Sequence, residues 1–226
     1  MIYLAFALGL LATNPAVAAD APKAPAPKTA AVSPLADPDF SIALRPQSPL
    51  LGFVGSDYQR LGIVFLSVTR EAQDHKVYDI IGYTLTRGTQ TPFTGKVTIA
   101  KVGRLKQLNY GVDDEMKGKV KAEGTAAGDY DLLSADGGRF TGTMTTQWFV
   151  DRSGKLQYDD IDIASDSYSN NQYTGQWRAS ASSAPKAANW GEYRIPQAGD
   201  LDSGAAQFFP ADKYKANGWA NFEPTK

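Results

Sequence analysis

The sequence predicts an all-β protein, an antiparallel strongly bent barrel or barrel-like sandwich of about eight or nine strands. Three observations favour this fold class. An aromatic-Thr-Gly phrase recurs at the front of three alternating stretches, PFTGKV, RFTGTM and QYTGQW. Short β-branched and aromatic segments, separated by Gly- and Asp-rich turns, fill residues 40–184. No segment in that range shows convincing apolar periodicity at the 3.6-residue period of a helix.

The recurring phrase places a glycine on the apolar face of each strand. Side chains alternate between the two faces of a strand, so Gly95, Gly142 and Gly175 share a face with the aromatic residue two positions earlier. An inward glycine favours a sharp bend at a barrel corner, covered by a neighbouring aromatic ring. The alternative is chance recurrence in a Gly-rich chain. The YTGQW opening resembles lipocalin- and avidin-type small barrels over this one strand, a likeness of architecture alone.

The two ends of the chain differ in composition from the middle. Residues 1–18 are an apolar run ending in small residues, which predicts a signal peptide and a periplasmic or secreted protein of the bacterial envelope. Residues 19–38 are rich in Pro, Ala and Lys and predict a disordered linker. Residues 39–184 are expected to form the barrel. Residues 185–226 are irregular but aromatic-rich, so we expect them to pack on the barrel as part of the same domain.

Composition excludes several chemistries. The chain has no cysteine and a single histidine, His75, which lies in a polar turn. Disulfides, a cysteine nucleophile and a zinc site built from Cys and His are therefore excluded. The net charge of −1 argues against a nucleic-acid partner. We expect no transmembrane segment after removal of the signal peptide.

Two groups of acids could bind calcium, the one cofactor that the sequence suggests. Asp200 and Asp202 stand in DLDSG, the D-x-D-x-G opening of an oxygen-donor loop. Asp159, Asp160 and Asp162 form the second group, where a phase change in the alternation predicts a β-bulge at 159–160. The alternative for both groups is metal-free turn chemistry.

The first functional hypothesis is an exported, non-enzymatic barrel that binds a small apolar or amphiphilic ligand, or a partner protein of the envelope. An eight-stranded barrel has room for one small ligand where side chains do not fill it. Six aromatic residues are expected to line the interior: Tyr83, Phe93, Phe140, Trp148, Tyr173 and Trp177.

Two other hypotheses remain open. The first is a carbohydrate-active hydrolase of the cell envelope, with paired Asp residues from 159–166 beside a Trp platform. It requires two carboxyls facing one cleft, at least one with a raised pKa. The second is a purely structural interaction domain whose barrel is packed solid, so that the size of the internal cavity separates it from the ligand-binding hypothesis.

Overall fold

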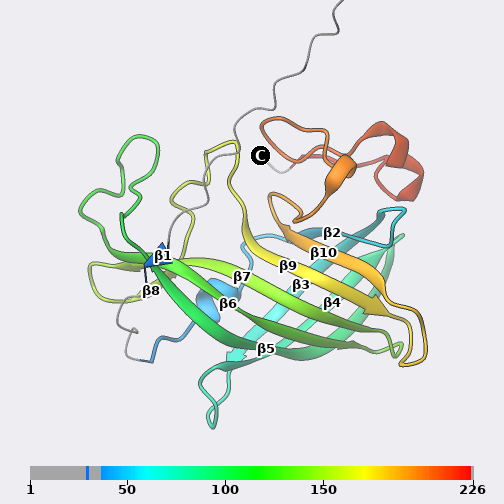
Figure 1. The fold of residues 1–226 in the computed structure, drawn as a ribbon, viewed down its shortest axis with the longest axis horizontal. Helices are drawn as coiled ribbons and strands as arrows, with labels where there is room; N and C mark the ends of the chain where they lie inside the picture. The colour runs from blue at the N-terminus through cyan, green and yellow to red at the C-terminus, as the bar shows by residue number, and fades with distance from the viewer. Residues whose placement is uncertain (1–28, 31–36, 225–226) are drawn as a thin grey trace, which may run out of the picture.

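Eight antiparallel strands close into a barrel in the computed structural model, which describes residues 29–30 and 37–224 (Figure 1). The order around the ring is β2-β3-β4-β5-β6-β7-β9-β10, and β10 pairs with β2 to close it. The strands are β2 (Leu50–Val54), β3 (Gln59–Arg70), β4 (Val77–Thr86), β5 (Thr89–Leu105), β6 (Val120–Ser134), β7 (Arg139–Asp151), β9 (Asn170–Arg178) and β10 (Lys186–Glu192). Two short strands add to the outside, β1 (Thr29–Ala30) on β5 and β8 (Leu156–Tyr158) on β7. The predicted fold class is confirmed.

The predicted and observed elements differ in two places. The expected bulge at 159–160 is absent because β8 ends at Tyr158, after which the Asp159 carboxylate accepts a hydrogen bond from the Ile161 amide (3.1 Å) and the chain turns away. The start of the expected C-terminal extension is instead β10, whose Trp190 is fully buried inside the barrel.

The glycines of the recurring phrase face the barrel interior, as predicted. The Tyr130 hydroxyl lies against two of them, so a Cβ added at Gly142 or Gly175 would come within 2.9 or 2.5 Å of that oxygen. A Cβ at Gly95 would meet the buried Leu132 side chain at 2.9 Å. The glycines therefore allow large neighbouring side chains to fill the space that their own side chains leave.

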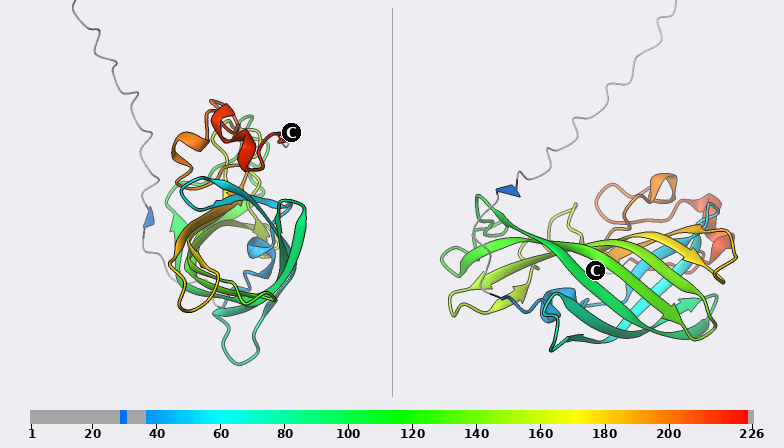
Figure 2. Two further views of the ribbon diagram at one scale, coloured as in Figure 1. Left: turned by 90° about the vertical axis from the view of Figure 1, so that its right-hand side faces the viewer. Right: turned by 60° about the horizontal axis from the view of Figure 1, so that its bottom comes forward.

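A short helix, α1 (Ser41–Leu44), closes one end of the barrel (Figure 2, left). Ala43 and Leu44 are fully buried in the barrel core, and Phe40 packs edge-on against Trp148 with ring centroids 6.1 Å apart. The Thr146 hydroxyl donates to the Ala43 carbonyl (2.9 Å), which fixes the helix to β7. This end of the barrel is called the α1 end.

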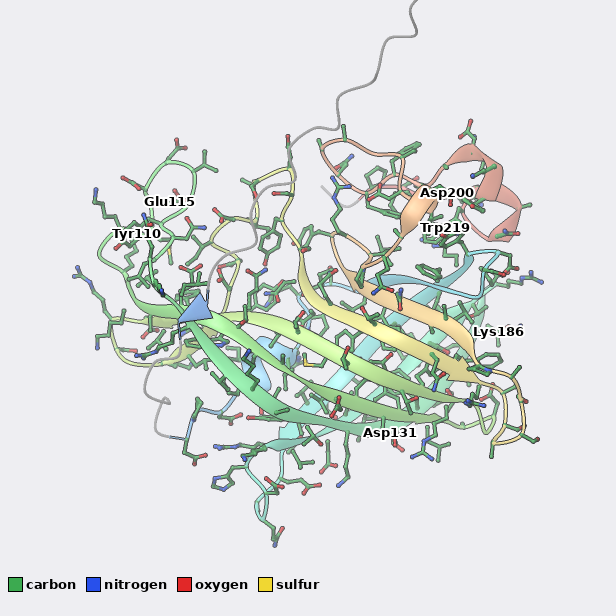
Figure 3. All side chains as sticks on the ribbon, viewed as in Figure 1. Tyr110, Glu115, Asp131, Lys186, Asp200 and Trp219 are labelled. Carbon is green, nitrogen blue, oxygen red and sulfur yellow. The ribbon has the colours of Figure 1, made fainter. Side chains whose placement is uncertain are left out.

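The C-terminal wrap, residues 193–224, covers the outer face of β2 and contains two 3-10 helices, η1 (Gly199–Leu201) and η2 (Asp212–Asn217). Its buried side chains pack on Phe53 of β2, and the Arg60 guanidinium of β3 lies 5.4 Å from the centroid of the Trp219 ring. Figure 3 shows Asp200 and Trp219 together in this layer. The prediction that an aromatic-rich extension packs on the barrel is confirmed. None of the helices within 37–224 is long and apolar enough to cross a bilayer.

The predicted signal peptide, residues 1–18, lies outside the described residues, as does most of the predicted linker. The described part of that linker contacts the barrel. Thr29 and Ala30 pair with the end of β5, and the Asp37 carboxylate accepts from Arg70 and, at 2.8 Å, pairs with the His75 Nδ1. At these positions backbone pairing and an ion pair connect the chain to the folded domain.

Candidate functional site

The end of the barrel opposite α1 is an open depression of about 500 Å³, called the mouth here. All eight barrel strands, or the turns that join them, contribute to its lining. The β2–β3, β4–β5, β6–β7 and β9–β10 turns all lie at this end. In Figure 3, Lys186 at the start of β10 marks the mouth, while Tyr110 and Glu115 of the β5–β6 loop lie at the α1 end. A volume of this size falls in the range of small-molecule sites.

The floor of the mouth is apolar. It consists of Leu61, Phe140 and Trp177, with Val54 at the side. The Phe140 and Trp177 rings lie 6.4 Å apart, and Phe140 also packs edge-on against Trp190 at 5.6 Å. Because Trp190 belongs to the buried core, Phe140 separates the mouth from the packed interior.

Hydroxyl groups line one side of the mouth, beside this floor. They belong to inward positions at the mouth ends of β4, β5 and β6: Thr84, Thr86, Thr89, Thr91 and Ser134. The alternation that buries apolar residues deeper in the same strands thus continues into the mouth with threonine and serine. Hydroxyls both donate and accept hydrogen bonds, so this side of the mouth can hold polar groups of either kind.

Four charged residues stand around the edge, one at each of the four turns. In the order of the ring they are Asp57 (β2–β3), Arg87 (β4–β5), Asp136 (β6–β7) and Lys186 (β9–β10), so that acid and base alternate. The Lys186 ammonium lies 5.8 Å from the Trp177 ring centroid, and Arg87 Nε donates to the Gln59 side chain (2.7 Å). The edge therefore carries two positive and two negative side chains.

The six aromatic residues predicted to line the interior fall into three groups. Phe140 and Trp177 line the mouth. Phe93, Trp148 and Tyr173 point inward but lie within the packed core, each at most 2% exposed.

The prediction that Tyr83 lines the barrel interior is wrong. Its strand buries Tyr78, Ile80 and Gly82, so Tyr83 has the opposite parity and lies on the outer face of the barrel. Gly82 takes the inward position beside it, where the Phe93 ring covers the glycine.

Aromatic rings fill the middle of the barrel. Tyr173 stacks on Trp190 with centroids 5.3 Å apart, and Tyr130 packs edge-on against both rings. The Tyr130 hydroxyl occupies the space over Gly142 and Gly175, so side chains fill this part of the interior. The open volume lies above this cluster, at the mouth.

A pair of buried carboxyls lies at the α1 end. Glu123 of β6 and Asp159 after β8 are each 4% exposed and share a hydrogen bond. The backbone amide of Asn109 donates to the Glu123 carboxylate (2.7 Å). This hydrogen bond attaches the β5–β6 loop to the pair. Burial, with a smaller contribution from the neighbouring charge of Asp162, raises the pKa of Glu123 to about 7 and that of Asp159 to about 6.

A third buried carboxyl, Glu192, joins β10 to the same end. Its carboxylate accepts hydrogen bonds from the Tyr158 hydroxyl (2.7 Å), the Asn171 amide (2.9 Å) and the Gln47 backbone (2.7 Å). Burial raises the pKa of Glu192, and these hydrogen bonds oppose that effect. The group is saturated by protein donors from three segments, so its arrangement is that of a structural junction.

The acids predicted to bind calcium are engaged otherwise. Asp202 pairs with Arg194 (2.7 Å), and Asp200 pairs with Lys213 and accepts from the Tyr214 hydroxyl (2.8 Å). In the other group Asp159 is bonded to Glu123, Asp162 accepts from Asn109, and Asp160 is exposed. Within the described ranges no three His, Asp or Glu side chains come together as a metal site. Calcium binding by these residues stays a prediction, and Asp200, Asp202 and Asp162 would have to exchange their present protein partners for the ion.

No protein-family model matches the chain, and neither a curated protein nor a solved structure is significantly similar to it. The function must therefore be argued from the geometry of the mouth.

Proposed function

We propose that the protein is an exported, non-enzymatic barrel that binds a small amphiphilic molecule in the mouth. The observation that carries this proposal is an apolar floor with hydroxyl groups on its β4–β6 side, open to solvent at one end of a barrel that is otherwise packed. The apolar part of the ligand would lie on Leu61, Phe140 and Trp177. Burying it there removes apolar surface of both partners from water.

The alternating charges at the edge indicate the polar part of the ligand. Two acids and two bases give the edge no net charge, so a headgroup with a net charge meets like charge as well as opposite charge. A zwitterionic headgroup, in contrast, can place each of its charges beside an opposite one. We therefore expect the ligand to be neutral overall.

Isothermal titration calorimetry tests this proposal with three amphiphiles that share an octyl chain and differ in the headgroup. Used below their micelle concentrations, octylphosphocholine should bind, whereas octyl sulfate and octyltrimethylammonium should bind more weakly. Thr86→Trp should abolish binding because it fills the mouth from an inward position. Thr143→Trp places the same ring on the exposed outer face of β7 and should bind as the wild type does. Absence of octylphosphocholine binding, or equal binding by Thr86→Trp, would contradict the proposal.

The hydrolase alternative receives less support from the geometry. The carboxyl pair with raised pKa values lies at the α1 end, whereas Trp177 lies at the mouth. Trp148 is fully buried and offers no platform to a sugar. Glu123 and Asp159 are closed off from solvent, so a glycan cannot reach them without rearrangement of the loops above.

Export is the second part of the proposal and rests on residues 1–18. Expression in a bacterium, followed by the intact mass of the periplasmic fraction, tests it directly. A mass that corresponds to loss of about eighteen residues is expected. Full-length protein confined to the cytoplasm would contradict export but would leave the binding experiment unaffected.

A further inference from the structure

The outer wall of the barrel has three faces of different chemistry. On β7 and β9 it carries a row of threonines: Thr141, Thr143, Thr145 and Thr174. On β2 the outward Phe53 is apolar but is buried by the C-terminal wrap. In the middle of β3 and from Ile81 onward on β4 large apolar residues again face outward, and here they are exposed or partly exposed to solvent.

This third face, called the outer patch, spans four neighbouring strands and consists of Val64, Leu66, Ile81, Tyr83, Leu85, Pro92 and Leu133. The register makes it continuous. Tyr83 pairs with Val64 on one side and Pro92 on the other, and Thr94 lies between Ile81 and Leu133. Leu66 is 56% exposed, Leu133 54% and Ile81 49%. Contiguous apolar surface of this kind on a soluble domain marks an interaction site.

A β-bulge places Leu66 in the outer patch. The pairing of β3 with β4 shifts by one residue between Phe65 and Ser67, so Leu66 is the extra residue on β3. The shift keeps Phe65 and Val68 against the barrel core on either side. The bulge therefore adds a large apolar side chain to the outside of the barrel without removing one from the inside.

We infer that the outer patch binds the outer patch of a second copy of this chain, across a two-fold axis. A patch on the outer wall of a barrel presents a sheet face, which suits packing against another sheet face. In a two-fold dimer each apolar row meets the same row of its partner. This inference does not depend on the ligand proposed for the mouth.

The charges at the border of the patch suit a second copy. On one side Lys96 pairs with Glu71 and lies 3.7 Å from Asp79. In the same row Asp131, which Figure 3 labels on β6, pairs in register with Lys96 and accepts from Arg139 Nε (2.6 Å). Acid and base therefore alternate along this border in the order Asp79, Lys96, Asp131 and Arg139, so the same border of a second copy, met in reverse, can exchange ion pairs with it. The three acids against two bases make an anionic lipid surface a poorer partner.

Sedimentation velocity over a concentration series tests the self-association. The wild type should show a monomer–dimer equilibrium, and Ile81→Lys should weaken it roughly 30-fold, the loss that corresponds to a hot-spot residue. The matched control Thr143→Lys adds the same charge to the threonine face and should dimerise as the wild type does. A wild type that stays monomeric at every concentration, or a dimer that Ile81→Lys leaves intact, would overturn the inference.

Cysteine cross-linking gives a second readout that does not depend on correct folding of the Ile81→Lys variant. Because the chain has no cysteine, a single introduced cysteine can form a disulfide only between copies. Among Leu66→Cys, Ile81→Cys and Leu85→Cys, at least one should give a covalent dimer under mild oxidation, and Thr143→Cys should not. Cross-linking by Thr143→Cys as fast as by the patch variants would count against the outer patch as the interface.

Discussion

Two single residues, Tyr130 and Gly175, show how the recurring phrase works. Gly175 has no Cβ, and the Tyr130 hydroxyl occupies the position beside it. A large side chain on β6 thus fills the space left by glycines on β7 and β9, as in other close-packed cores. The phrase is consequently a packing device, and its threonine lies on the opposite face.

Gly175→Ala should destabilise the fold by about 1–3 kcal/mol, because overpacking a close-packed core forces its neighbours to move. The added Cβ would lie 2.2 Å from the Thr141 carbonyl oxygen and 2.5 Å from the Tyr130 hydroxyl. Urea unfolding measures the change. Thr174→Ala, on the outer face of the same strand, is the control and should change stability by less than about 0.5 kcal/mol. Equal effects of the two variants would contradict an inward Gly175.

The Glu123–Asp159 pair should make stability depend on pH. The pKa of Glu123 is raised from 4.5 to about 7 and that of Asp159 from 3.8 to about 6. The folded state therefore retains protons that the unfolded chain has already released in this range. Each carboxyl contributes stability at low pH that is lost as the pH rises from about 4 to about 7.

Urea unfolding at a series of pH values measures this dependence. The free energy of unfolding should fall by roughly 1 kcal/mol per pH unit for each carboxyl and level off above the raised pKa values. Glu123→Gln should reduce the slope, because a neutral amide replaces one titrating group. The exposed Glu115→Gln is the control and should leave the slope unchanged. A wild-type stability that rises between pH 5 and pH 7 would contradict the assignment.

At the scale of elements, the C-terminal wrap acts as an outer layer on β2 and β3. Trp219 is 1% exposed, and its indole donates to the Tyr58 carbonyl at 2.7 Å. Its ring packs on Phe208 and Phe222, and the wrap as a whole buries Phe53. The wrap therefore stabilises the strands that it covers instead of forming a separate unit.

Trp219→Ala should cost about 3–5 kcal/mol, the range for removal of a buried aromatic side chain. Phe209→Ala is a matched control in the same layer, because Phe209 is 46% exposed, and it should be close to neutral. Chemical denaturation followed by circular dichroism gives both values. Nearly neutral behaviour of Trp219→Ala would mean that the wrap does not contribute to the stability of the domain.

At the scale of the whole molecule, one strand joins two cores. Leu50 of β2 lies in the barrel core, and Phe53 of the same strand lies in the cluster under the wrap. If either core opens, one face of β2 is exposed to water, and the packing of the other core against the opposite face is weakened. The barrel and the wrap should therefore unfold in one cooperative transition, as small single domains usually do.

Tryptophan fluorescence can follow the two cores separately. A variant that keeps only Trp219 reports on the wrap, and one that keeps only Trp190 reports on the barrel. Their denaturation midpoints, each compared with the circular dichroism midpoint of the same variant, should coincide. A transition of the wrap that precedes that of the barrel would show that the wrap is an independent layer.

The sequence by itself determined the all-β class, the inward glycines and the aromatic layer at the C-terminus. These features depend on local alternation and composition, and both are visible in one chain read in order. The sequence also indicated Phe140 and Trp177, although it grouped them with Phe93, Trp148 and Tyr173, because side-chain parity gives the face of a strand but not the depth in a barrel.

Only the tertiary structure decided which part of the interior is open. The mouth takes its lining from eight strands and their turns, so residues such as Thr84, Asp136 and Lys186 come together only when the ring closes. The one local feature of the sequence that indicates these residues is the presence of polar side chains at inward positions next to turns. The same holds for the pairing of Glu123 with Asp159 and for the continuity of the outer patch. Each joins distant segments, and the register of strand pairing is set by the packing of the whole barrel.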